Sequence, residues 1–226
     1  FKEVDLGLDD NSALREAERC LNCKNPPCVK GCPVGVKIPD FIKSIKDSDV
    51  NLAYKIILKD NIFPAVCGRV CPQEKQCEAK CVRNKSGEPV AIGSLERYCA
   101  DKSSENKKLE CILGDNPHKI AVVGSGPSGL TCASELAGLG FEVTVFEALH
   151  TPGGVLAYGI PEFRLPRKVL VRELENLKNK GVKILTNVVA GQSFSINSLF
   201  EQGYSAVYIS SGAGLPNFMN IPGEGM

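Results

Sequence analysis

The sequence lacks the features of a membrane or nucleic-acid-binding protein. Its 226 residues carry 27 Lys and Arg against 26 Asp and Glu, and a net charge of +1 gives no electrostatic reason to expect an anionic partner. No apolar run approaches the roughly 20 residues that span a bilayer. The polar, acidic residues 1–19 do not resemble a signal peptide. We therefore expect a cytoplasmic protein without a nucleic-acid or membrane partner.

The sequence is poor in histidine and rich in cysteine. It has only two His but 11 Cys, ten of which precede residue 112. In a cytosolic chain, cysteines at this density indicate metal or redox ligands before they indicate disulfides. The composition thus predicts a cysteine-rich domain over residues 1–110 and a second domain over residues 118–226, with a linker at 101–116.

Short helices separated by cysteine loops are predicted for the first domain. Asp10 and Asn11 can cap a helix that ends near Leu21. Pro39 favours the start of a second helix, and apolar residues at 52, 56 and 57 suggest a third. Cys77 and Cys81 are four residues apart, which would place both on one helix face, and a last helix begins near residue 94.

The second domain alternates strands with helices, the pattern of an α/β fold with a parallel sheet. The predicted strands are 119–123, 141–147, 182–187 and 205–212, and the predicted helices are 130–140, 167–181 and 195–203.

Residues 124–129, GSGPSG, fit the dinucleotide-binding pattern G-x-G-x-x-G. Gly124 allows a tight turn, Gly126 lets a pyrophosphate approach the backbone, and Gly129 lets the helix pack on the strand. Pro127 costs little in the first helical turn, because its missing N–H would be unpaired anyway. Glu147, at the end of the second strand, can bind a ribose hydroxyl. A glycine turn that only packs the sheet is the alternative.

A second glycine pair favours FAD as the nucleotide. Gly153 and Gly154 follow Glu147 after a short loop, and bare backbone there lets a large flat cofactor lie along the chain; an ordinary crossover loop is the alternative. Gly212 and Gly214 do not form a second nucleotide turn, since no helix can follow them, but this loop can still contact the first cofactor.

Two groups of four cysteines have the spacing of iron–sulfur ligands. They are Cys20, Cys23, Cys28 and Cys32, and then Cys67, Cys71, Cys77 and Cys81. A proline follows one cysteine in each group, as in bacterial ferredoxins, where that cysteine serves the other cluster. Zinc prefers two Cys-x2-Cys pairs or a Cys/His mixture, and only one such pair is present. The pattern predicts two [4Fe–4S] clusters, with a zinc-stabilised interaction domain as the alternative.

Spacing alone does not identify every ligand. Eight cysteines would suffice for two clusters, yet Glu96 and Cys99 lie three apart on a helix near them. Cys111, in the linker, and Cys132, in a helix expected to be buried, are predicted to be inert.

The order of these motifs resembles one family. Two four-cysteine groups, then IGSLERY, then VVGSGPSGL, then E-x5-GG-x-L-x-x-GIP-x-x-R-L-P occur in sequence. This arrangement resembles the small (beta) subunit of NADPH-dependent glutamate synthase and its relatives. Those relatives include the larger subunit of NADH-dependent ferredoxin:NADP oxidoreductase and the N-terminal half of dihydropyrimidine dehydrogenase.

The resemblance implies an α-helical two-[4Fe–4S] domain followed by an incomplete α/β Rossmann-like FAD domain. Electrons would enter from NADPH at FAD and pass through the clusters to a larger catalytic or flavin-containing partner subunit. No catalytic acid–base residue is implied. The alternative within this class is a subunit of an electron-bifurcating NADH-dependent ferredoxin:NADP oxidoreductase.

The resemblance also implies the site residues. One cluster would be bound by Cys20, Cys23, Cys28 and Cys81, and the other by Cys32, Cys71, Cys77 and Glu96, which leaves Cys67 unbound. The FAD residues would be Gly124, Gly126, Pro127, Ser128, Gly129, Glu147, Gly153, Gly154, Leu156, Arg164 and Ala213. Family members continue into an NADPH-binding domain. Because this sequence begins at Phe1 and ends at Met226, we expect a fragment that lacks the NADPH site and is inactive alone.

Overall fold

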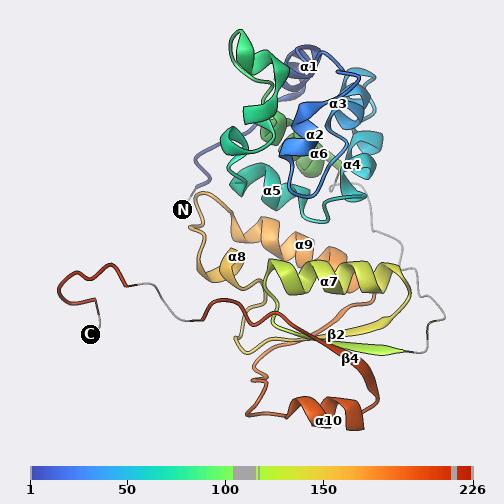
Figure 1. The fold of residues 1–226 in the computed structure, drawn as a ribbon, viewed down its shortest axis with the longest axis vertical. Helices are drawn as coiled ribbons and strands as arrows, with labels where there is room; N and C mark the ends of the chain where they lie inside the picture. Colours follow the sequence, from blue (N-terminus) through green and yellow to red (C-terminus); the bar gives the residue numbers. More distant parts are fainter. Residues whose placement is uncertain (1, 104–115, 117, 215–217, 225–226) are drawn as a thin grey trace. The chain divides into compact units, whose positions relative to one another are not determined.

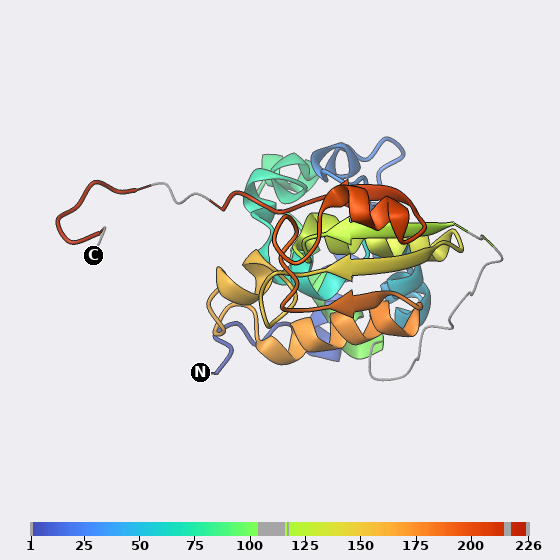
Figure 2. The same cartoon turned by 90° about the horizontal axis from the view of Figure 1, so that it is seen from below.

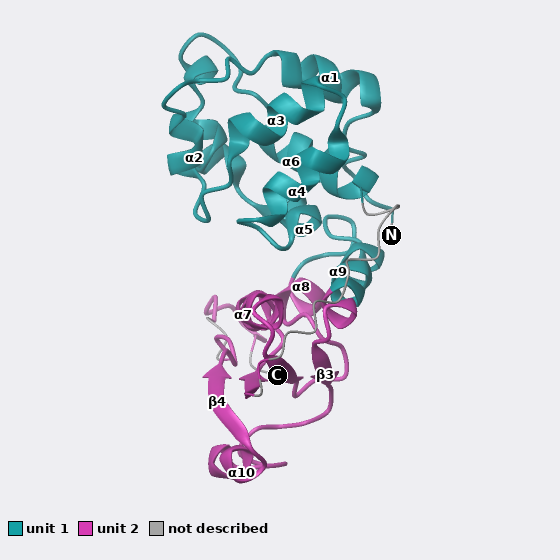
Figure 3. Ribbon diagram, turned by 90° about the vertical axis from the view of Figure 1, so that its right-hand side faces the viewer, with its two compact units in different colours: residues 1–110, 160–176 teal, residues 111–159, 177–226 magenta. Residues whose placement is uncertain are grey.

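The residue ranges of two structural units interleave along the chain (Figure 1; Figure 3). In the computed structural model, which describes residues 2–103, 116, 118–214 and 218–224, the first unit comprises Phe1–Glu110 and Ile160–Asn176. The second comprises Cys111–Gly159 and Leu177–Met226. Within the described residues, no helix combines the length and apolar character that a membrane crossing requires.

The first unit is built from short helices. They are α1 (Asp10–Glu18), α2 (Pro27–Gly31), α3 (Ile38–Lys46), α4 (Val50–Leu58), α5 (Pro64–Val70) and α6 (Ile92–Ser103), with 3-10 turns η1 (Gln73–Lys75), η2 (Glu78–Lys80) and η3 (Val82–Lys85). The carboxylate of Asp9 accepts from the Ser12 N–H at 2.7 Å and caps α1. The cap therefore lies one residue before the predicted pair, and α1 ends at Glu18, not near Leu21. Helices α2 and α5, each of which begins at a proline, were not predicted.

The prediction that Cys77 and Cys81 share one helix face is wrong. These residues flank the three-residue turn η2, and Cys81 has an extended ψ of 133°. A three-residue 3-10 turn does not complete a helical face, so the four-residue spacing reflects a loop.

Helices α1, α3, α4 and α6 contribute to the core of the first unit. Phe41, Ile57 and Leu95 are among its fully buried side chains. Helices α5 and α6 pack at backbone contact, because a Cβ on Gly68 would lie only 2.7 Å from the backbone nitrogen of Arg97. This close packing positions the loop that follows α5.

Ion pairs attach residues 160–176 to the first unit. Asp101, on α6, accepts from the Arg172 guanidinium at 3.2 Å and from Arg69 at 2.6 Å. The Val4 N–H donates to the Phe163 carbonyl at 3.1 Å. The predicted boundaries had placed this segment in the second domain. Helix α9 (Arg167–Asn179) begins in the first unit and ends in the second.

A four-stranded parallel sheet forms the second unit. Its strands are β1 (Lys119–Val123), β2 (Glu142–Phe146), β3 (Lys183–Leu185) and β4 (Tyr204–Ile209), in the order β3-β2-β1-β4. Figure 2 shows them side by side. Helix α7 (Pro127–Gly138) lies on one side of the sheet and α10 (Ile196–Glu201) on the other, and α8 (Val155–Tyr158) follows β2 (Figure 1). The predicted alternation of strands and helices is confirmed.

Candidate cofactor sites

The cysteine loops of the first unit are held together by close backbone contacts. Cys28 lies on α2 and Cys32 ends it, whereas Cys77 and Cys81 flank η2. A Cβ on Gly31 would lie 2.7 Å from the carbonyl oxygen of Gln76, so the two loops meet at a distance that only glycine permits. The fold thus brings cysteines separated by more than 40 residues into one region.

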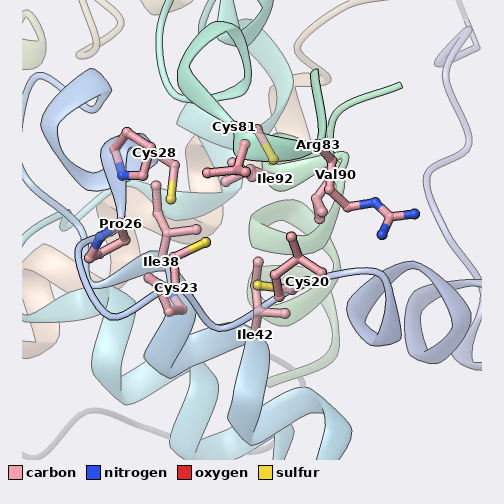
Figure 4. Close-up of a pocket in the computed structure, with 14 residues that line it drawn as sticks. Cys20, Cys23, Pro26, Cys28, Ile38, Ile42, Cys81, Arg83, Val90 and Ile92 are labelled. Atoms are coloured by element: carbon pink, nitrogen blue, oxygen red, sulfur yellow. The ribbon is translucent and has the colours of Figure 1, made fainter. Parts of the chain in front are cut away.

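Four sulfurs surround one apolar pocket (Figure 4). The pocket is lined by Cys20, Cys23, Cys28 and Cys81, and by apolar side chains that include Ile38, Ile42, Val90 and Ile92. Figure 4 shows the four thiols around a common space, while Arg83, on its rim, directs its guanidinium away from the sulfurs. These are the four cysteines that the resemblance assigns to one cluster. Lys46 also helps to hold the backbone at Cys20 in place, because its Nζ donates a hydrogen bond to the Cys20 carbonyl at 2.8 Å.

A second group gathers near α5 and α6. Burial raises the pKa of Cys77 to about 12, with smaller electrostatic contributions from Cys32 and Glu96. Burial likewise raises the pKa of Glu96 to about 8, and Cys71 acts in the same direction. These four groups are therefore electrostatic neighbours. They are the four that the resemblance assigns to the other cluster.

The donor chemistry of the first group fits an iron–sulfur cluster. Within the described ranges, no three Cys, His, Asp or Glu side chains are placed to hold one metal ion. In a cubane each iron takes its own protein ligand, so the sulfurs stand apart around a cavity. The first pocket has this arrangement.

Four further cysteines do not belong to the two proposed ligand sets. Cys99 is fully buried on α6, and burial raises the pKa of its thiol. Cys132 is partly exposed on α7, contrary to the expectation of a buried position. Cys111 lies outside the described residues. Cys67 belongs to the second region, 3.6 Å from the Asn61 side chain.

The glycine turn of the second unit has the geometry of a nucleotide site. Gly124 has φ +98°, and a side chain there or at Gly129 would overlap neighbouring backbone atoms. A Cβ on Gly126 would meet nothing within 4 Å, so this position is open to a ligand. Pro127 and Ser128 form the first turn of α7, whose unpaired N–H groups favour an anion.

The acid and the second glycine pair lie against this turn. Glu147 is 6% exposed and accepts from the backbone N–H of Leu149 at 2.8 Å and of Ser125 at 2.9 Å. Gly154 has φ +52°, and a Cβ on it would lie 2.8 Å from the Gly126 Cα. Three predicted elements of the site therefore lie in contact.

Ser125 joins these elements, although the sequence analysis did not single it out. Its side chain is fully buried, donates to Glu147 Oε2 and accepts from the Gly153 N–H at 2.9 Å. The G-x-G-x-x-G pattern leaves this position free. A hydroxyl between the first two glycines, followed by an acid at the end of the next strand, is the signal that could have identified it.

The other residues predicted to contact FAD do not lie together in one group. Leu156 is buried on α8, and Ser128 Oγ lies 2.9 Å from the Tyr208 hydroxyl. Ala213 is exposed in the segment that follows β4. Arg164 belongs to the first unit, where it donates to the Val70 carbonyl at 3.3 Å. Its contact with a cofactor stays a prediction.

Comparisons with known proteins agree with this arrangement. Residues 1–108 match the family described as dihydropyrimidine dehydrogenase domain II, 4Fe-4S cluster, and residues 122–166 match the NAD(P)-binding Rossmann-like domain. The predictions of an iron–sulfur domain and a dinucleotide-binding domain are confirmed.

Curated relatives cover nearly the whole chain. It is 37% identical to the NAD-dependent dihydropyrimidine dehydrogenase subunit PreT of Salmonella typhimurium, over 96% of this chain and 53% of the relative. It is 35% identical to the NADPH glutamate synthase small chain of Escherichia coli, over 94% of this chain and 45% of the relative. It is 34% identical to the small chain of the same enzyme from Azospirillum brasilense, over 100% of this chain and 47% of the relative. The predicted resemblance is confirmed. The chain spans about half the length of these relatives.

Proposed function

From its homology to the small chains of NADPH glutamate synthase and to PreT, we propose that this chain is the FAD and iron–sulfur part of an NADPH-dependent oxidoreductase. It would transfer electrons between FAD and a partner subunit. The observation that carries this proposal is the pocket in which four sulfurs face one another between apolar walls.

Two sets of side chains would hold the clusters. Cys20, Cys23, Cys28 and Cys81 would bind one, and Cys32, Cys71, Cys77 and Glu96 would bind the other. A bound [4Fe–4S] cluster supplies one-electron transfer. The protein's own part is to fix the positions of the ligands and to exclude water from the sulfurs, which the apolar walls of Ile38, Ile42 and Ile92 do in the first pocket.

The second unit would bind FAD. The N-terminus of α7 and the open Gly126 would receive the pyrophosphate, and Glu147 would accept a hydrogen bond from a ribose hydroxyl. The contact between Gly154 and Gly126 supports FAD, because it extends the bare backbone surface beyond the phosphate turn.

A larger partner subunit would receive the electrons. The names of the relatives, "small chain" and "subunit", describe components of assemblies. The partner would be either an amidotransferase-type catalytic subunit or, in an electron-bifurcating enzyme, a flavin-containing subunit. Both alternatives use the same residues of this chain.

Iron and acid-labile sulfide analysis of anaerobically purified protein tests the proposal. We expect about eight irons and eight sulfides per chain, as two [4Fe–4S] clusters require. Cys28→Ser should lower both by about half, whereas Cys132→Ser, at a partly exposed position on α7, should leave them unchanged. A colourless protein that contains zinc and no sulfide would refute the proposal.

A further inference from the structure

Asn61 lies between α4 and α5, beside both candidates for the eighth cluster ligand. It is 8% exposed, and a buried amide needs partners for both its oxygen and its nitrogen. The Phe63 N–H points at one atom of the amide at 3.0 Å. Since a backbone N–H requires an acceptor, that atom is Oδ1, and Nδ2 must face the other way.

The orientation of the amide fixes one oxygen of Glu96. Asn61 Nδ2 donates to Glu96 Oε1 at 2.7 Å. Among the described residues, the structure shows no hydrogen bond to Glu96 Oε2. A ligating carboxylate is typically oriented by such a partner, which occupies one oxygen and leaves the other for the metal. Glu96 therefore has the arrangement of a ligand before any cluster is bound.

The same amide has the opposite relation to Cys67. The Cys67 Sγ lies 3.6 Å from Asn61 Oδ1, so its S–H is the donor and the oxygen the acceptor. A cysteine that binds iron has lost this proton, so the contact with Oδ1 and ligation of iron by Cys67 exclude each other.

We propose that Asn61 is a positioning residue that presents Glu96 to the second cluster and keeps Cys67 from replacing it. The inference rests on the proposed iron–sulfur function and adds the reason why a carboxylate, and not the nearby thiol, completes the ligand set. Asn61 acts through these side chains and does not touch the cluster.

The sharpest test is Asn61→Asp in the anaerobically purified holoprotein. The variant keeps an acceptor for Phe63 and Cys67 and replaces only the donor to Glu96, so that two carboxylates face each other. We expect an altered EPR signal and midpoint potential for one cluster, the one that Glu96→Ala also alters, and no change in the other. Asn51→Asp, an exposed position on α4, adds the same charge and should leave both signals unchanged.

A double variant tests the pairing itself. In Asn61→Asp with Glu96→Gln, the amide and the carboxylate exchange places, the hydrogen bond reforms, and the amide oxygen of residue 96 faces the cluster. We expect its EPR signal and midpoint potential to lie closer to those of the unmodified protein than those of Asn61→Asp alone do. No such return, or unchanged signals in Asn61→Asp, would overturn the inference.

Cys67→Ser provides a test that does not depend on the stability of the Asn61 variants. We expect both clusters to remain with unchanged signals, and loss of one cluster would overturn the inference. If the unmodified protein itself contains no iron, the proposed function fails. If it contains both clusters and the Asn61 variants behave like it, only the role of Asn61 fails.

Discussion

Ser125 makes the nucleotide site of the second unit a single hydrogen-bonded structure. Its hydroxyl group connects Glu147, from the end of β2, with the N–H of Gly153, and it is fully buried. Without it, the carboxylate and the Gly-Gly loop would each lose a partner and gain freedom to move away from the turn. Loss of the Ser125 hydroxyl should therefore affect FAD binding, since these elements surround the proposed FAD site.

We expect Ser125→Ala to weaken FAD binding by about tenfold. Each lost hydrogen bond has a net value of about 1 kcal/mol, and 1.4 kcal/mol corresponds to a factor of ten in affinity. Quenching of flavin fluorescence measures the dissociation constant. Ser205→Ala, an exposed position on β4, is the matched control and should bind FAD normally. Equal affinities for the two variants would show that Ser125 has no positioning role.

The sequence predicts the residues of the glycine turn better than those of the cluster sites. Gly124 and Gly129 follow from a local pattern, and the structure shows why no side chain fits at either. Cys81 was assigned to the pocket of Cys20 only through the family resemblance, because spacing carries no information about a contact across some 60 residues. Asn61 was missed for the same reason: nothing local to it indicates Glu96.

At the scale of elements, α9 introduces a buried carboxylate into the first unit. Glu173 is 2% exposed, and burial raises its pKa to about 7. Asp101 acts weakly in the same direction, whereas Arg172, Asn176 and Arg69 oppose the rise. Tyr54, on α4, faces the same group, and burial raises the pKa of its hydroxyl above the usual range. Folding therefore favours the protonated form of Glu173.

We expect this carboxylate to make the first unit less stable as the pH rises. Because the pKa of Glu173 is higher in the folded state than in the unfolded state, its contribution is fully present below about pH 4.5 and is lost as the pH approaches and passes 7. The loss is on the order of 3 kcal/mol at pH 8. Glu173→Gln should remove this dependence, so that its melting temperature exceeds that of the unmodified protein by more at pH 8 than at pH 6. Glu175→Gln, an exposed position on the same helix, should retain it. Parallel pH profiles for the Glu173→Gln variant and the unmodified protein would contradict the prediction.

Elements with a strong hydrophobic period were predictable, and elements defined by loop geometry were not. The strands and α7, α9 and α10 have the expected positions within a few residues. Helices α2 and α5 are five and seven residues long and carry cysteines, so no apolar face reveals them. The turn η2 was mistaken for a helix because a spacing of four also fits a loop that binds a cluster.

At the scale of the whole molecule, each unit has a hydrophobic core of its own. The core of the first is formed by residues such as Phe41, Ile57 and Leu95, and that of the second by the strand residues Val122 and Val143 together with Leu130. The change in composition near residue 112 predicted two domains. The association of residues 160–176 with the first unit was not predictable, since this segment lies within the α/β pattern and its ion pairs with Asp101 are remote in sequence.

The separate cores predict that loss of the clusters affects the two units differently. Residues 20–37 and 71–86 contain seven of the eight proposed ligands but only short helical turns, so ligand binding would supply much of their folding energy. We expect that anaerobic removal of iron with a chelator abolishes amide-hydrogen protection in these segments, while the amides of β1 and β2 remain protected. Hydrogen exchange followed by mass spectrometry measures both in one sample. Reconstitution with iron and sulfide should restore protection in the cysteine segments. Equal loss of protection in β1 and β2 would show that the units unfold together, and unchanged exchange in the cysteine segments would show that their loops fold without a cluster.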